Sequence, residues 1–283
     1  MDGRYIVGVD GSSPSDAAVA WAVQRARRDG APIVLAHVRD PEAGMMGEDF
    51  ARDEERRGTD ILRGVLDGLV GSGLAVSMVV LDGPLPWALA QAVTVHDVVV
   101  VGTHKIGFLH GRVLGSRSVQ VAATVPCTVT VVPEVDLRFR RGVVAGIDRE
   151  ETAAAIARAA AAEADARGEE LVIVQSVRKT RIPRSELPLA TAVAAARAAY
   201  PSLQIRSRVS ERPPAEALLD AARDKALLVL GPGSTDAARS PIGSVLHDVL
   251  LNVNAPVLVA RPADARQLVG PVASSTRRTE TSG

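Results

Sequence analysis

Short runs of β-branched apolar residues alternate along this chain with longer segments in which apolar positions recur at helical spacing. A short apolar run between turn residues is typical of a buried parallel strand, and an amphipathic segment is typical of a helix that covers such a sheet. The first half reads strand–helix four times and then a closing strand, which predicts an open, doubly wound α/β sheet of five parallel strands. The predicted strands are residues 4–9, 32–38, 74–81, 98–101 and 128–132, and the predicted helices are residues 17–28, 50–70, 86–95 and 116–125. Pro14 and Ser15 suit the start of the first helix, and Gly30 suits its end.

The same pattern repeats in the second half. An apolar run ends at Asp148 as the first strand ended at Asp10, and Gly243-Ser244 repeats the pair Gly115-Ser116. A repeat this long predicts tandem domains rather than a solenoid, and about ten residues are missing from the second helix of the second copy. We predict one domain at residues 1–135, a degenerate copy at 140–262 after a linker over 134–140, and a disordered polar tail at 263–283.

Composition narrows the possible partners and the compartment. The 33 basic and 33 acidic residues cancel, which argues against a nucleic-acid binder driven by bulk charge. The single cysteine, Cys127, rules out an intramolecular disulfide and fits a reducing cytosol, with the thiol buried as a small apolar group. Neither a signal-peptide pattern nor a long apolar run is present, so we expect a cytoplasmic protein without membrane contact. Aromatic residues make up only 2%, so the cores must be built from Ala, Val, Leu and Ile.

The loop after the fourth strand of the first half is suited to an anion. Glycines at 102, 107, 111 and 115 allow backbone N–H groups to approach a ligand closely. The helix that starts near Ser116 offers free N–H groups with partial positive charge. An ordinary helix start with a serine cap fits the same residues. The usual P-loop, G-x4-G-K-[S/T], does not occur in the chain.

This stretch carries a family resemblance. The spacing of its residues resembles the motif G-2x-G-9x-G-[S/T] of the universal stress protein (UspA) family. Gly102 occupies the first position of the motif and Gly115-Ser116 the last two, but Lys105 replaces the second glycine. The context is also similar, because a strand ends at the first glycine and a helix and a closing strand follow. The resemblance covers nearly the whole chain and implies two tandem Rossmann-like domains of the adenine nucleotide alpha hydrolase type, each with strand order 3-2-1-4-5.

The resemblance also implies an adenine-nucleotide site. In strand order 3-2-1-4-5 the ends of strands one and four meet at the reversal point, where open parallel sheets bind ligands. Asp10 corresponds to the acidic residue near the ribose, and Val38 to the position that reads adenine through main-chain groups. Phosphates are expected on Gly102, Gly115, Ser116, Arg117 and Ser118, with ATP, with or without Mg²⁺, as the ligand. From the residues alone, Asp10 fits a helix cap equally well, and Val38 fits a strand core.

Lys105 is the residue that decides between two functional hypotheses. Its ammonium group either pairs with phosphate or fills the pocket and prevents binding. The favoured hypothesis is a stress-response regulator that binds ATP or a related adenine nucleotide in its first domain. The alternative is an interaction module of the same fold that binds no nucleotide. His104 and His110 share this loop, but a metal site would need more ligands, so we expect none.

The second copy has lost parts of the motif. Arg149-Glu150-Glu151 replaces Gly-Ser-Ser after the first strand, and the spacing after Gly231 is shortened, so weaker nucleotide binding or none is expected there. No nucleophile is paired with a base in a usual catalytic signature, so we expect no enzyme beyond weak ATP hydrolysis or autophosphorylation. The closing strands, residues 128–132 and 257–260, would be open apolar edges. The resemblance implies that such closing strands pair antiparallel, so we predict that the two pair with each other within one chain, and a homodimer is a further expected assembly.

Overall fold

The computed structural model of this chain describes residues 3–39, 48–103, 117–177, 187–233 and 242–261, without the side chains of 48–51. The first repeat contains β1 (Tyr5–Gly8), α1 (Ser13–Asp29), β2 (Ile33–Arg39), α2 (Glu48–Gly68), β3 (Val76–Asp82), α3 (Leu85–Ala92), β4 (Val98–Thr103), α4 (Arg117–Thr124) and β5 (Thr128–Pro133). The second repeat contains β6 (Val143–Ile147), α5 (Glu150–Asp165), β7 (Leu171–Ser176), α6 (Leu187–Ala199), β8 (Ile205–Ser210), α7 (Pro214–Ala222), β9 (Leu227–Leu230), α8 (Ser244–Leu251) and β10 (Val257–Val259).

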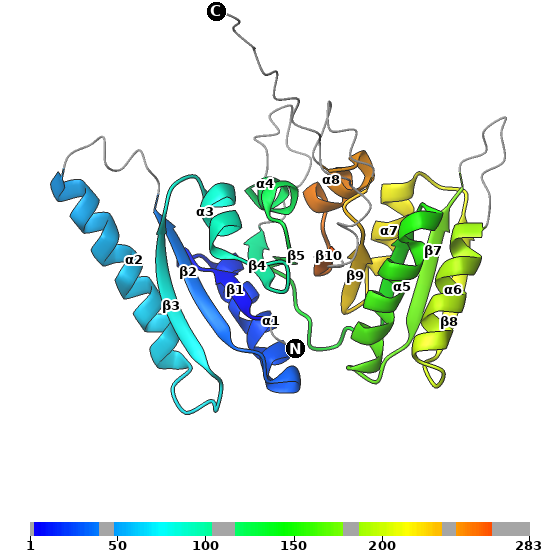
Figure 1. The fold of residues 1–283 in the computed structure, drawn as a ribbon, viewed down its shortest axis with the longest axis horizontal. Coiled ribbons are helices and arrows are strands. Elements are labelled where there is room, and N and C mark those ends of the chain that lie inside the picture. The colour runs from blue at the N-terminus through cyan, green and yellow to red at the C-terminus, as the bar shows by residue number, and fades with distance from the viewer. Residues whose placement is uncertain (1–2, 40–47, 104–116, 178–186, 234–241, 262–283) are drawn as a thin grey trace, which may run out of the picture.

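These strands form one continuous sheet in the order β3-β2-β1-β4-β5-β10-β9-β6-β7-β8 (Figure 1). Within each repeat the strands are parallel and follow the order 3-2-1-4-5, so the predicted fold is confirmed. The two repeats join through β5 and β10, which pair antiparallel with Thr130 opposite Leu258. The predicted pairing of the closing strands is therefore confirmed, and each strand covers the apolar edge of the other.

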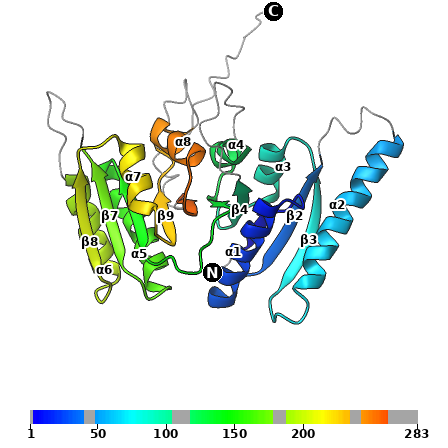
Figure 2. The same cartoon turned by 180° about the vertical axis from the view of Figure 1, so that it is seen from behind.

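Helices cover both faces of this sheet, as Figure 1 and Figure 2 show from opposite sides. Buried residues of α1, α2, α5 and α6 pack on one face, and those of α3, α4, α7 and α8 pack on the other. Aliphatic side chains and alanines fill both cores, as the low aromatic content predicted. Cys127 is fully buried as expected, and burial raises the pKa of its thiol to about 11. Among the described helices, none has the length and apolar character to span a membrane.

The helix boundaries differ from the predicted ones for identifiable reasons. α1 begins at Ser13, one residue before the predicted start, because the Ser12 hydroxyl accepts a hydrogen bond from the Ser15 amide at 3.4 Å and Pro14 fits the first turn. It ends where predicted, at Gly30, which adopts the left-handed conformation with φ of 73°. The predicted shortening in the second repeat is seen in α6, which has 13 residues where α2 has 21.

Candidate functional site

The cleft of the first repeat lies where the strand order reverses. β1 pairs with β2 on one side and with β4 on the other, so the connections that follow β1 and β4 lead away from each other. A cavity of about 280 Å³ opens at this point. The residues of its lining that sequence analysis assigned to a nucleotide are Asp10, Val38, Gly102, Arg117 and Ser118. The structure thus brings together residues from β1, β2, β4 and α4.

Asp10 follows β1 and organises the turn into α1. Its Oδ1 atom accepts hydrogen bonds from the Ser12 amide at 3.0 Å and from the Ser12 hydroxyl at 2.5 Å. Burial opposes ionisation, but the hydrogen bonds from Ser12 prevail and hold the pKa of Asp10 below its ordinary value. Asp10 therefore places a carboxylate at the cleft and also orders the start of the helix, so the two roles considered from the sequence are compatible.

Gly102 lies in β4 directly beside α1. A Cβ atom built on Gly102 would lie 2.1 Å from the carbonyl oxygen of Pro14 and 2.8 Å from the amide nitrogen of Ser15. The missing side chain thus allows the first turn of α1 to approach the strand. This approach places Ser12 and Ser15 in the lining of the cleft.

Arg117 and Ser118, at the start of α4, differ in their surroundings. Arg117 is exposed, and the structure records no ion pair for it among the described residues. Ser118 is buried, and its hydroxyl donates to Thr103 Oγ1 at 3.3 Å. The predicted phosphate donor Ser118 therefore also links α4 to β4. The other predicted phosphate residues, Lys105, Gly115 and Ser116, and the two loop histidines, His104 and His110, lie outside the described residues.

The cleft also includes the start of α3, which was not predicted from the sequence. Residues 83–86 line the cavity, and Leu85 joins Val38 and Val101 in an apolar wall. The turn Asp82-Gly83-Pro84 was an available signal, because a turn directly after β3 places the next helix at the same edge of the sheet. Within the described part of the chain, no group of three or more potential ligand side chains could hold a metal ion.

Comparison with known proteins identifies the family. The sequence model of the universal stress protein family matches residues 3–133 and again residues 140–261. This chain belongs to that family. A universal stress protein of Mycolicibacterium smegmatis is 30% identical over 283 residues, which span 91% of this chain and 96% of the relative. One of Mycobacterium bovis is 27% identical over 284 residues, which span 90% of this chain and 96% of the relative.

A solved structure agrees with the fold of this universal stress protein. The crystal structure of a universal stress protein from Archaeoglobus fulgidus DSM 4304 superposes with a TM-score of 0.74 at 16% identity. The superposition covers 92% of this chain and 97% of that chain. At this level of identity the likeness supports the tandem fold alone, and the chemistry of each cleft has to be argued from its own residues.

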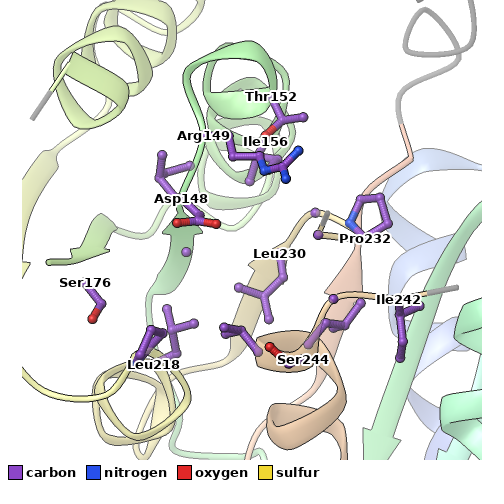
Figure 3. Close-up of a pocket in the computed structure, with 18 of the residues that line it drawn as sticks. Asp148, Arg149, Thr152, Ile156, Ser176, Leu218, Leu230, Pro232, Ile242 and Ser244 are labelled. Carbon is purple, nitrogen blue, oxygen red and sulfur yellow. The ribbon is translucent and has the colours of Figure 1, made fainter. Parts of the chain in front are cut away.

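The second universal stress protein domain has a larger cleft at the equivalent place (Figure 3). Its cavity measures about 520 Å³ and is lined by Asp148, Gly231 and Gly243, the counterparts of Asp10, Gly102 and Gly115. A Cβ atom on Gly231 would meet the Ile156 side chain at 2.7 Å, whereas one on Gly102 would meet the backbone of α1. In the second domain the Ile156 side chain therefore lies between α5 and the end of β9. In the first domain the backbone of α1 packs directly against β4. The sequence predicted a poorer nucleotide site here and gave no sign of a larger cavity.

Proposed function

We propose that this universal stress protein is a stress-response regulator that binds ATP or a related adenine nucleotide in the cleft of its first domain. The observation that carries the proposal is the convergence of Asp10, Val38, Gly102, Arg117 and Ser118 on one cavity at the reversal point of the sheet. These residues were assigned from the family resemblance, and their presence in the lining of one cavity supports the proposal.

The chemistry of the lining fits a ligand with an apolar ring and an anionic end. Val38, Leu85 and Val101 form an apolar wall, and Arg117 supplies a positive charge beside the N-terminus of α4. The Asp10 carboxylate suits sugar hydroxyls, which donate hydrogen bonds. Asp10 is the only carboxylate in the described lining, so Mg²⁺ would be held mainly by the phosphates of the nucleotide.

A binding role is favoured over catalysis by what the described lining contains. Its titratable side chains are Asp10 and Arg117. Asp10 contacts the Ser12 hydroxyl, but that hydroxyl caps α1, and its hydrogen bond helps to hold the pKa of Asp10 below its ordinary value, which makes this carboxylate a weak general base. We therefore propose a regulator in which bound nucleotide is the signal, with at most slow hydrolysis or autophosphorylation. The single buried thiol fits action in a reducing cytoplasm.

Isothermal titration calorimetry of ATP into the full chain tests this assignment. We expect one site, and we expect Arg117→Ala to weaken binding by about tenfold because a charge-assisted contact to phosphate is lost. The matched control is Arg149→Ala, which removes the same kind of side chain from the cleft of the second domain and should leave ATP affinity unchanged. If Arg149→Ala weakens ATP binding and Arg117→Ala does not, ATP binds in the second domain, which contradicts this proposal. Absence of ATP binding by the parent would favour the interaction-module hypothesis.

A further inference from the structure

The cleft of the second domain is an apolar cavity of a size suited to a small molecule. Its volume of about 520 Å³ falls within the roughly 300–1,000 Å³ that is typical of such sites. Figure 3 shows Ile156, Leu218 and Leu230 converging on it from α5, α7 and β9. Val174 and Leu246 add aliphatic groups from β7 and α8. An apolar wall built from five elements favours an apolar occupant.

The residues that would contact phosphate are replaced in this domain. Because Gly243-Ser244 matches Gly115-Ser116, Val245 occupies the position of Arg117, and Leu246 that of Ser118. Both replacements line the second cleft, and Leu246 is only 2% exposed. The guanidinium and the hydroxyl of the first cleft thus give way to two aliphatic side chains, which cannot stabilise a charged ligand.

The backbone of the second cleft is also less available to an anion. The Gly243 amide, at the N-cap of α8, donates to the carbonyl oxygen of Pro232 at 3.0 Å. A Cβ atom on Gly233 would lie 2.9 Å from the Cα of Gly243, so the two ends of the motif are held together. The Gly243 amide is therefore already hydrogen-bonded within the protein and is not free to bind an anion.

The charges in and next to the segment that enters the cleft oppose a phosphate. Asp148 lines the cavity, and Glu150 and Glu151 lie in the first turn of α5, next to Arg149. Residues 148–151 therefore carry three carboxylates and one guanidinium, where the first domain has Asp10 followed by the uncharged residues 11–13. A polyphosphate would meet net repulsion here, whereas a group that donates hydrogen bonds would find acceptors.

We propose that the second-domain cleft binds a neutral, mainly apolar small molecule, oriented by a hydroxyl or amino group that donates to the Asp148 carboxylate, and excludes nucleoside phosphates. The apolar body of the ligand would contact the aliphatic wall, and its donor group would lie at the mouth. The proposal depends on the lining of the second cleft alone, and it holds whether or not the first cleft binds ATP.

A fluorescence titration of the full chain with N-phenyl-1-naphthylamine tests the proposal, since this probe is neutral, apolar and carries one N–H donor. We expect saturable binding at one site, unchanged by millimolar ATP. Val245→Arg should weaken it by about tenfold or more, because it places a charge in the apolar wall. Asp148→Ala should weaken it several-fold through loss of the acceptor. The matched control is Val209→Arg on β8, which lies outside the cleft and should bind the probe as the parent does.

Circular dichroism tests whether each variant is folded. If Val245→Arg does not fold, Leu246→Ser is used in its place. Binding that resists ATP but is weakened by Val245→Arg or Leu246→Ser supports the proposal. Three results would overturn it: no saturable probe binding, displacement of the probe by ATP, or parent-like binding by the folded cleft variants. None of these results depends on the Arg117 experiment, so failure of one site does not imply failure of the other.

Discussion

At the scale of single residues, Gly102 shows how the first cleft is formed. Its nearest neighbours are backbone atoms of α1, which cannot rotate away as the end of a side chain can. We expect Gly102→Ala to lower the free energy of unfolding by about 2 to 3 kcal/mol, because the added methyl group would push α1 away from β4. Urea denaturation of parent and variant measures this difference.

Gly64→Ala is the matched control for this substitution. Gly64 lies in α2 with no atom within 4 Å of an added Cβ, so alanine there should raise the free energy of unfolding by about 0.5 to 1 kcal/mol. Equal effects of the two substitutions would show that the close approach of α1 to Gly102 is absent in solution.

The residues of the first cleft could be predicted from the sequence only in part. Asp10 and Gly102 each follow a buried apolar run, so their place at the strand ends is local information. The contact between Gly102 and Pro14, and the hydrogen bond of Ser118 to Thr103, depend on how closely distant segments approach. Sequence spacing contains no such distances, which is why the packing role of Gly102 was not foreseen.

At the scale of elements, the pairing of β5 with β10 leaves one polar group without a partner. Thr130 is fully buried opposite Leu258, and its hydroxyl has no hydrogen-bond partner within the described residues. A desolvated hydroxyl without a partner costs stability, so Thr130→Val should raise the free energy of unfolding by about 1 to 2 kcal/mol. The shift of the urea midpoint relative to the parent measures this gain.

Thr128 offers a control in the same strand. Its hydroxyl accepts a hydrogen bond from the Arg261 amide at 3.3 Å, which joins β5 to the residues after β10. Thr128→Val should therefore give no gain, or a loss of about 1 kcal/mol. If both substitutions stabilise the protein equally, the hydroxyl of Thr130 is not the source of the effect.

Elements were more predictable than the spaces between them. The strands were recognisable because short β-branched runs are bounded by turn residues, and their order followed from the family motif. The start of α1 could be predicted to within one residue, because Pro14 marks the first turn of a helix. The size of the second cleft was not predictable, because it depends on how closely side chains such as Ile156 approach distant segments such as Gly231, and sequence spacing contains no such distances.

At the scale of the whole molecule, a buried ion cluster supplements the shared sheet. Arg25 of α1 forms an ion pair with Glu163 of α5, which also pairs with Arg167. The guanidinium of Arg25 lies 5.0 Å from the centre of the Trp21 ring, so an aromatic face holds it in place. Arg25 belongs to the first domain and Glu163 to the second, so this cluster links the domains at a point away from the strand pairing.

The charge of Glu163 should be required for this link. Burial alone would raise the pKa of Glu163, but the charges and hydrogen bonds of Arg25 and Arg167 hold the pKa below its ordinary value near 4.5. Glu163→Gln keeps the shape of the side chain but leaves two buried guanidinium groups without a counter-charge. We expect the free energy of unfolding at neutral pH to fall by about 3 kcal/mol, as measured by urea denaturation.

The dependence of this difference on pH separates lost charge from altered packing. Because the pKa of Glu163 is lowered on folding, its stabilisation is complete well above pH 4.5 and is lost as the pH falls below that value. The parent should therefore exceed Glu163→Gln by a constant amount between about pH 6 and 8, and the gap should narrow in acid. Glu216 of α7 pairs with Arg212, and both side chains are more than half exposed, so Glu216→Gln should change stability by less than about 0.5 kcal/mol. A gap for Glu163→Gln that stays constant into acid would assign the loss to packing and not to the ion cluster between the domains.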